Sequence, residues 1–279
     1  MTESRRTRWK LLRVLSLLLL LAALAGWFRW QQTGLSTEEL TAAAAPDGFA
    51  GYRIAVVSDL HGREFGRENR RLLAFTAALE PDLIAVTGDL IHDPAQLPVV
   101  PPLARGLAAI APTYYVTGNH EWAAGVVVEL EPLLERCGVA VLSNEAVLLE
   151  RNGDRIALLG AEDANGPAGQ KSVSALAKEA RAAWGEDVYT ILLSHRNDHE
   201  DRYVRAGVDL TLCGHAHGGL IRLPGTDGLI GPGREWFPTH TAGLYRLERG
   251  ELAVSRGLGD KFPAFRLFDR PDVPVVVLR

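Results

Sequence analysis

Hydrophobic and polar positions divide the chain into a long apolar segment near its N-terminus and a body of short elements. The apolar, uncharged stretch runs from Val14 to Phe28, and Leu11 and Leu12 extend it across Arg13. The eighteen residues from Leu11 to Phe28 fall just short of the ~20 that span a bilayer. The pattern therefore predicts a membrane-spanning or export segment.

Charge around this segment predicts its orientation. Five bases precede or interrupt it, and Trp27 and Trp30 lie at its C-terminal end, where an interfacial aromatic belt would be. Because positive residues stay on the cytoplasmic side, we expect the body outside the cytoplasmic membrane. We favour an uncleaved anchor in the cell membrane. The alternatives are export with signal cleavage after Ala23-Leu24-Ala25, by a route that includes the twin-arginine one, and a buried helix of the fold.

The segment after the apolar stretch is polar and rich in alanine. Residues 31–50 contain Pro46-Asp47-Gly48 and few large apolar side chains. We interpret them as a linker, with room for a short helix ending at Ala45. The predicted organisation is a basic segment plus anchor helix (1–30), a linker (31–50) and one domain (51–279).

In the body, short β-branched and apolar runs alternate with stretches of helical periodicity. Predicted strands are Tyr52–Ser58, Leu83–Thr87, Thr113–Thr117, Val139–Leu142, Ala146–Leu149, Arg155–Leu159, Val188–Ser194, Val208–Cys213 and the closing run Val273–Leu278. Predicted helices are Arg67–Leu79, Gln96–Ile110, Val126–Arg136 and Lys171–Trp184. From Ile221 onward the pattern is strand and turn. The alternation predicts an α/β fold with mixed sheets.

Composition and charge remove several functional classes. The 279 residues are 47% hydrophobic and 23% charged, which is typical of one or two folded domains. Two cysteines exclude a disulfide framework and a four-cysteine zinc site. Residues 1–30 hold six bases and one acid, so the net charge of −4 leaves −9 on the remainder. Such a body lacks the basic stripe of a nucleic-acid-binding protein, and we expect no nucleic acid as partner.

Polar clusters follow five of the predicted strands. They are Asp59-Leu60-His61, Gly88-Asp89, Gly118-Asn119-His120-Glu121, Ser194-His195 and Gly214-His215-Ala216-His217. Each cluster alone is a common turn, but open α/β sheets place their sites at the carboxyl ends of strands. Carboxylate, imidazole and amide ligands together suit divalent ions such as Mn, Fe or Zn. Seven ligands, one of them shared, match two octahedral ions with a bridging water.

In this order the five clusters resemble the motif set of the calcineurin-like metallophosphoesterases. The resemblance covers about residues 52 to 278 and implies a four-layer αββα sandwich of two mixed β-sheets. Further stretches resemble a bacterial branch that is typically membrane-anchored or exported: His61-Gly62 through Phe65-Gly66, Gly218-Gly219, residues 241–245 and residues 255–259.

The resemblance assigns a role to each motif residue. It implies that one metal is bound by Asp59, His61, Asp89 and His217. It implies that the other is bound by Asp89, Asn119, His195 and His215, with Asp89 bridging. His120 would be a catalytic residue that faces the substrate, stabilising the transition state or protonating the leaving oxygen. Two such ions lower the pKa of a bridging water and clamp the phosphoryl oxygens, and a histidine of near-neutral pKa suits proton transfer.

Departures from other branches of the family sharpen the expectation. Gly88-Asp89 lacks the following Arg-Gly of Ser/Thr protein phosphatases, and His92 stands where purple acid phosphatases have an iron-binding tyrosine. Leu220 and Asn197 replace a glutamine and a proline that are common in the bacterial branch, both near the expected rim of the site. We interpret His92, His199 and His240 as surface residues or as supports of metal ligands.

The expected activity is hydrolysis of a phosphodiester, pyrophosphate or phosphomonoester bond by a hydroxide that two metals activate. A phosphorylated small molecule or lipid is the expected substrate, and we favour a phospholipid or a lipid-linked diphosphate. The loop from Arg222 to His240 is either packed on its own aromatic side chains or forms a wall facing a lipid tail. The alternative function is a non-catalytic, metal-stabilised envelope binding protein. The sequence leaves the metal pair and the oligomeric state open.

Overall fold

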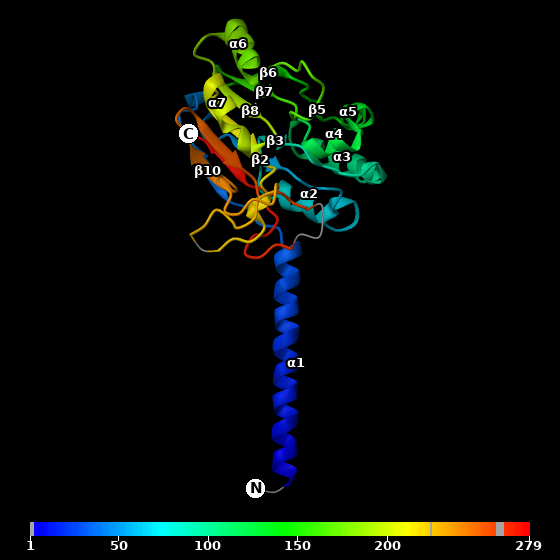
Figure 1. The fold of residues 1–279 in the computed structure, drawn as a ribbon. Helices are drawn as coiled ribbons and strands as arrows, with labels where there is room; N and C mark the ends of the chain where they lie inside the picture. The colour runs from blue at the N-terminus through cyan, green and yellow to red at the C-terminus, as the bar shows by residue number, and fades with distance from the viewer. Residues whose placement is uncertain (1–2, 224, 261–264) are drawn as a thin grey trace.

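The computed structural model describes residues 3–223, 225–260 and 265–279, and their side chains from residue 8 onward. Helix α1 (Glu3–Thr33) projects from a domain in which helices lie outside two sheets (Figure 1). No side chain in the apolar window of α1 is buried. Within the described ranges, Arg8–Thr33 is the helix long and apolar enough to cross a membrane. The alternative of a buried core helix is therefore wrong.

The first sheet has the order β1-β12-β2-β3-β4-β5. Its strands are β1 (Glu39–Ala42), β2 (Arg53–Val57), β3 (Leu83–Val86), β4 (Thr113–Tyr115), β5 (Ala140–Val141) and β12 (Val275–Leu278). Strands β2 to β5 are mutually parallel, and β12 runs antiparallel to β2. All four residues of β12 are buried, as expected for a strand that lies between two others, β1 and β2.

The second sheet has the order β10-β11-β9-β8-β7-β6. Its strands are β6 (Glu145–Arg151), β7 (Asp154–Gly160), β8 (Tyr189–Leu193), β9 (Leu210–Cys213), β10 (Gly243–Arg246) and β11 (Glu251–Val254). The inner four are parallel, and the two edge strands are antiparallel to their neighbours. Both sheets are mixed, as the sequence predicts.

Three apolar clusters stack the layers. Ile54 and Val56 of the first sheet share a buried core with Ile191 and Leu212 of the second, so the sheets pack face to face. Helices α2 (Arg70–Ala77), α3 (Val100–Ile110) and α5 (Val127–Arg136) cover the outer face of the first sheet. Helices α6 (Val173–Trp184) and α7 (Glu200–Ala206) cover that of the second. The result is the expected αββα sandwich.

Several local expectations are wrong. Residues 39–42, expected in a linker with a helix, form β1, which pairs parallel with β12 and buries Leu40 and Ala42. The expected helices from Arg67 and from Gln96 begin as the short 3-10 helices η2 (Arg67–Asn69) and η3 (Pro94–Val99). Glu68 has a φ of 55° inside η2, and Pro98 lies inside η3, which explains the breaks.

Two helices escape the sequence pattern because they are short. These are α4 (Asn119–Ala124) and α7, of six and seven residues, too few for a helical period to show. The remaining 3-10 turns are η1 (Asp47–Phe49), η4 (Asn197–His199) and η5 (His217–Gly219). Three of these short elements, α4, η4 and η5, begin at or just after the polar clusters at the strand ends.

Candidate metal centre

The expected site residues lie where the carboxyl ends of the two sheets meet. Three of the clusters follow β2, β3 and β4 in the first sheet, and two follow β8 and β9 in the second. Five of the residues have positive φ: Asp59 (51°), His61 (51°), Asp89 (54°), His215 (67°) and His217 (48°). A left-handed backbone costs a non-glycine residue about 1 kcal/mol or more. Five of the seven expected ligands therefore have a left-handed backbone, a conformation that clusters at functional sites.

One group joins Asp59, His61 and His217, whose candidate ligand atoms lie within 4.8 Å of one another. The Nε2 atoms of His61 and His217 are 3.4 Å apart. Nε2 of His61 is 3.7 Å from Oδ2 of Asp89, and Nε2 of His217 is 3.7 Å from Oδ1 of Asp59. The four residues expected at the first metal therefore face a common centre.

The second group joins Asp89, His195 and His215 within the same limit. Nε2 of His195 is 3.2 Å from Oδ2 of Asp89 and 3.1 Å from Oδ1 of Asn119. Nδ1 of His215 is 3.1 Å from Nε2 of His195. The four residues expected at the second metal also converge, and Asp89 adjoins both groups.

Backbone carbonyls orient two of the imidazoles. Nδ1 of His195 lies 2.7 Å from the carbonyl oxygen of Thr87, and Nδ1 of His217 lies 3.2 Å from that of Gly259. A ring whose Nδ1–H donates to a carbonyl keeps the Nε2 lone pair available to a metal. In both residues it is Nε2 that faces a carboxylate of the cluster, Asp89 for His195 and Asp59 for His217.

The carboxylate of Asp89 tests whether the site fits metal ions. It is 1% exposed, and its Oδ2 has no hydrogen bond of good geometry among the described residues. Burial by itself raises the pKa of Asp89, but the surrounding imidazoles, His195 above all, hold it well below its usual range. A buried, ionised oxygen between two sets of ring nitrogens fits a bridging metal ligand.

Close backbone approach makes this convergence possible. A Cβ atom on Gly214 would lie 2.2 Å from Oδ2 of Asp59, and one on Gly118 would lie 2.2 Å from Oδ1 of Asp89. At Gly214 the approach lets the N–H of His215 donate to Asp59 at 3.0 Å. The glycines of the motifs are therefore required by space at the carboxylates.

His120 stands at the edge of the cluster. Its side chain is 20% exposed, its N–H donates to Oδ1 of Asp89 at 2.8 Å, and its Nε2 lies 3.9 Å from Oδ2. Its ring is close enough to His61 and Asp89 to form a third potential ligand group. Partial exposure sets it apart from His61 and His195, and it suits the expected role of facing the substrate.

Glu121 lies in one of the five sequence clusters but has no role among the expected ligands. Its buried carboxylate accepts four backbone N–H groups: those of Gly118 (2.9 Å), Asp89 (3.0 Å), Leu90 (2.6 Å) and Ile91 (3.4 Å). Burial and the charge of Asp89 raise the pKa of Glu121 to about 8, whereas the four donors favour its ionised form. A glutamate three residues after a helix N-cap is the capping-box signal that indicates such a contact.

Asp260 supports His217 from behind. Its Oδ1 lies 3.1 Å from Nδ1 of His217, and its Oδ2 accepts from Nε of the fully buried Arg266 at 3.0 Å. Burial by itself raises the pKa of Asp260, but Arg266 and His217 hold it below its usual range. The carboxylate therefore stays ionised behind a metal-facing imidazole. No sequence signal indicated this contact, because Asp260 follows His217 by 43 positions.

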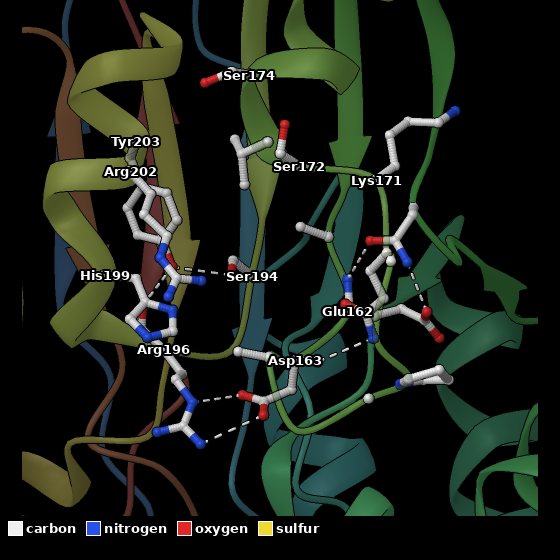
Figure 2. A pocket seen from close by; sticks show the side chains of 18 of the residues that line it. Glu162, Asp163, Lys171, Ser172, Ser174, Ser194, Arg196, His199, Arg202 and Tyr203 are labelled. Atoms are coloured by element: carbon white, nitrogen blue, oxygen red, sulfur yellow. Dashed lines mark hydrogen bonds and ion pairs between the residues drawn. The ribbon is translucent and has the colours of Figure 1, made fainter.

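Arg196, whose Nη1 lies 3.5 Å from Nε2 of His215, lines two cavities. The larger, of about 710 Å³, also includes Lys171, Arg202 and Asp163 (Figure 2). Figure 2 shows Arg196 directed at Asp163, which accepts from its Nε at 2.8 Å. The other cavity, of about 480 Å³, is lined by His215 and by residues 232, 233, 235 and 237–239 of the long loop. The smaller cavity therefore reaches the cluster at His215, and Arg196 joins it to the larger one, whose lining includes none of the expected metal ligands.

The remaining sequence interpretations concern peripheral residues. Nε2 of His92 is 3.4 Å from Nε2 of Gln96, whose own Nε2 donates to the carbonyl of His61. Arg222 begins the loop that runs to His240. Its guanidinium donates to the carbonyls of Gly218 and Asp227 and to Oγ1 of Thr241. His92 thus lies beside a segment that supports His61, and Arg222 braces the loop.

Replacing Glu121 tests the role of its carboxylate. In Glu121→Gln one acceptor oxygen becomes a donor facing N–H groups, so the loop that holds Asp89 loses order. We expect metal affinity to fall about 10- to 100-fold, as for other residues that support ligands, with the fold retained. Metal content after dialysis measures this, and Glu129→Gln, an exposed change on α5, is the matched control. Unchanged affinity in Glu121→Gln would contradict the role.

Comparison with known proteins agrees with this geometry. A family model described as calcineurin-like phosphoesterase matches residues 52–219. Bacillus subtilis YkuE, named an uncharacterized metallophosphoesterase, is 29% identical over 84% of this chain and 81% of its own. Escherichia coli phosphodiesterase YaeI is 28% identical over 83% and 84%. A Bos taurus transmembrane protein with metallophosphoesterase domain is 30% identical over 89% of this chain and 58% of its own. The matched family model covers more than half of the chain, which therefore belongs to the calcineurin-like phosphoesterase family.

Proposed function

We propose that the chain hydrolyses a phosphoric ester or anhydride bond with two divalent ions held by the residues around Asp89. The single observation that carries this proposal is the buried Asp89 carboxylate, which adjoins both groups of ring nitrogens. Asp59, His61 and His217 would hold one ion with Asp89. Asn119, His195 and His215 would hold the other, and imidazole with carboxylate suits Mn, Fe or Zn.

The chain's own residues orient the substrate and move the proton. When bound, two such ions lower the pKa of a water and neutralise phosphoryl oxygens. Asn119, being neutral, contributes an oxygen without adding negative charge next to an anionic substrate. His120, partly exposed beside Asp89, donates a proton to the leaving oxygen. Arg196, whose Nη1 lies 3.5 Å from Nε2 of His215, binds a non-reacting oxygen of the substrate.

We propose a phospholipid or a lipid-linked diphosphate as substrate. The polar cavity beside Arg196 holds more basic than acidic side chains, which suits an anionic headgroup. The other cavity has Phe237, Pro232 and Pro238 in its lining beside the carboxylates of Asp198, Glu200 and Glu235, and we assign the start of an acyl or prenyl chain to its apolar part. Membrane association through α1 brings such a substrate to the site.

We further propose that α1 is an uncleaved anchor and that the domain lies outside the cytoplasmic membrane. The helix exposes apolar side chains along its length, and its bases gather at the N-terminal end. The name of the Bos taurus relative, a transmembrane protein, supports membrane association. Cleavage after Ala25 would instead leave Trp27 to Trp30 at the new terminus.

The alternative of a metal-stabilised binding protein has less support. A binding module needs ligands such as His195, but it has no use for a partly exposed histidine held beside them by a backbone bond to Asp89. His120 therefore favours catalysis.

The roles of Asp89 and His120 are separable. We expect Asp89→Asn to lose both metal content and hydrolysis of bis-p-nitrophenyl phosphate, because the shared ligand loses its charge. We expect His120→Ala to keep both metals but to lose about 100-fold or more in rate, since proton transfer is lost. His240→Ala, outside the cluster, is the matched control, and Mn with and without a chelator completes the assay. Loss of a metal in His120→Ala would show that His120 is a ligand, and an inactive metal-loaded wild type would favour the binding protein.

A comparison of substrates tests the lipid proposal. Full-length protein in vesicles should hydrolyse a phospholipid or lipid-linked diphosphate with a higher kcat/KM than the same headgroup without its chain. The physical reason is that the chain concentrates the substrate in the membrane and contacts the wall around Phe237. Chromatographic separation of the phosphorylated and dephosphorylated hydrolysis products measures both reactions. Equal kcat/KM for the two would refute a lipid substrate, and the phosphoesterase activity itself would stand.

Protease access tests the sidedness. A tag fused after Arg279 should be removed by protease added to host cells whose outer barriers are open and whose cytoplasmic membrane is intact. The reason is that the basic end of α1 stays in the cytoplasm and the domain is translocated. A cytoplasmic marker protein checks that the membrane is sealed. Full protection of the tag until the membrane is permeabilised would place the domain in the cytoplasm.

A further inference from the structure

We propose that the end of the domain next to α1 rests on the bilayer and inserts Leu223, Phe265 and Phe268 between lipid headgroups. We call these three residues the apolar rim. The occupant of this surface is the lipid bilayer that α1 crosses. The inference rests on the proposed anchoring by α1 and is independent of the chemistry at the metal centre.

The rim is exposed although its side chains are large and apolar. Leu223 is 44%, Phe265 49% and Phe268 53% exposed. They belong to two segments that a backbone bridge joins. Ile221 pairs with Leu267, and the N–H of Arg222 donates to the carbonyl of Leu267 at 3.0 Å. Clustered apolar side chains on one end of a folded domain mark a contact surface.

Ring contacts with α1 identify the partner. Trp27 and Phe268 have ring centroids 5.5 Å apart, and those of Phe28 and Phe265 are 6.1 Å apart. Both helix residues lie at the end of the apolar stretch, where aromatic side chains occupy the boundary between hydrocarbon and headgroups. Two rim phenylalanines therefore lie at the depth of that boundary.

Distances along the helix agree with this depth. The eighteen residues from Leu11 to Phe28 span about 27 Å, close to a hydrocarbon core of about 30 Å. From Trp27 to Thr33, where α1 ends, the rise is about 9 Å, comparable with one headgroup layer of about 5–8 Å. The domain therefore begins where the headgroups end, and only projecting side chains reach deeper.

Polar contacts hold the rim against the helix. Gln32 donates to the carbonyl of Arg266 at 2.6 Å and accepts from its N–H at 2.9 Å. The guanidinium of Arg270 lies 4.2 Å from the ring centroid of Trp30, and Arg63 donates to the carbonyl of Gln32. A cradle of this kind fixes the height of the rim relative to α1.

The same cradle connects to the metal centre. The side chain of Arg266 pairs with Asp260, which contacts His217. The backbone of Leu220, three residues after His217, accepts from the N–H of Leu267 at 3.0 Å. In Figure 1 the loop that follows η5 lies at the end of the domain where α1 emerges. A domain seated on the rim therefore holds the metal centre near the headgroups, where the phosphate of a lipid lies.

Depth-dependent fluorescence quenching tests whether the apolar rim is inserted in the bilayer. Full-length Phe268→Cys and Leu223→Cys, each labelled with an environment-sensitive fluorophore, are reconstituted in vesicles of phosphatidylcholine with phosphatidylglycerol. We expect blue-shifted emission, several-fold stronger quenching by lipids that carry a shallow nitroxide, and weak quenching by aqueous iodide. The reason is that the rim side chains are inserted to about the depth of an interfacial helix. The two native cysteines are buried, so the wild-type chain serves as the unlabelled blank.

Two matched positions make the outcome decisive. Val128→Cys, at an 83% exposed position on α5, should show the opposite pattern, with strong iodide quenching and no lipid quenching. Leu18→Cys, in the middle of α1, should be quenched by lipid in every case. Lipid quenching at Leu18 without quenching at Phe268 and Leu223 would overturn the rim and leave the anchor intact. Absence of quenching at Leu18 would overturn the anchor and the rim together, and activity on soluble diesters would still stand.

Discussion

The structure depends on one buried carboxylate, that of Asp89, which two sheets surround with ring nitrogens. A charge with 1% exposure is costly to desolvate, and here His195 from the end of β8, with His61 and His120 from the ends of β2 and β4, offsets the cost. Each comes from a different strand, so the charge is stabilised only when both sheets pack in register. The same arrangement makes the carboxylate available to two metal ions, which joins the stability of the interface to its chemistry.

Around that carboxylate the backbone is strained and further charged side chains are buried. Five cluster residues have a left-handed backbone, and Glu121 gathers four N–H groups of the two loops that flank Asp89. Behind His217, Asp260 contacts the imidazole and is itself paired with Arg266. Strained conformations persist only where many surrounding contacts fix them. The residues behind the ligands, such as Glu121 and Asp260, therefore help to hold the ligands in position.

Contacts between side chains connect helix α1 to the candidate metal centre. The residues that end α1, from Trp27 to Gln32, contact the segment that contains Arg266. Arg266 in turn braces the carboxylate that supports His217. A catalytic domain connected in this way does not tumble on a free tether. The strand β1, which follows α1 by five residues and joins the first sheet, has the same effect, because the chain enters the sheet almost as soon as it leaves the helix.

The sequence by itself determined the apolar segment, the α/β alternation and the polar clusters, because each depends on neighbours within a few residues. Short apolar runs ending in Asp59 or His195 indicate strands with functional ends whatever surrounds them. Only the tertiary structure decided that Leu40 belongs to a sheet, that Glu121 binds the loop of Asp89, and that Arg266 connects Gln32 to His217. These contacts join positions that are 30 to 236 residues apart or elements too short to show a period. Their energy comes from desolvation and geometry that exist only once both sheets are packed.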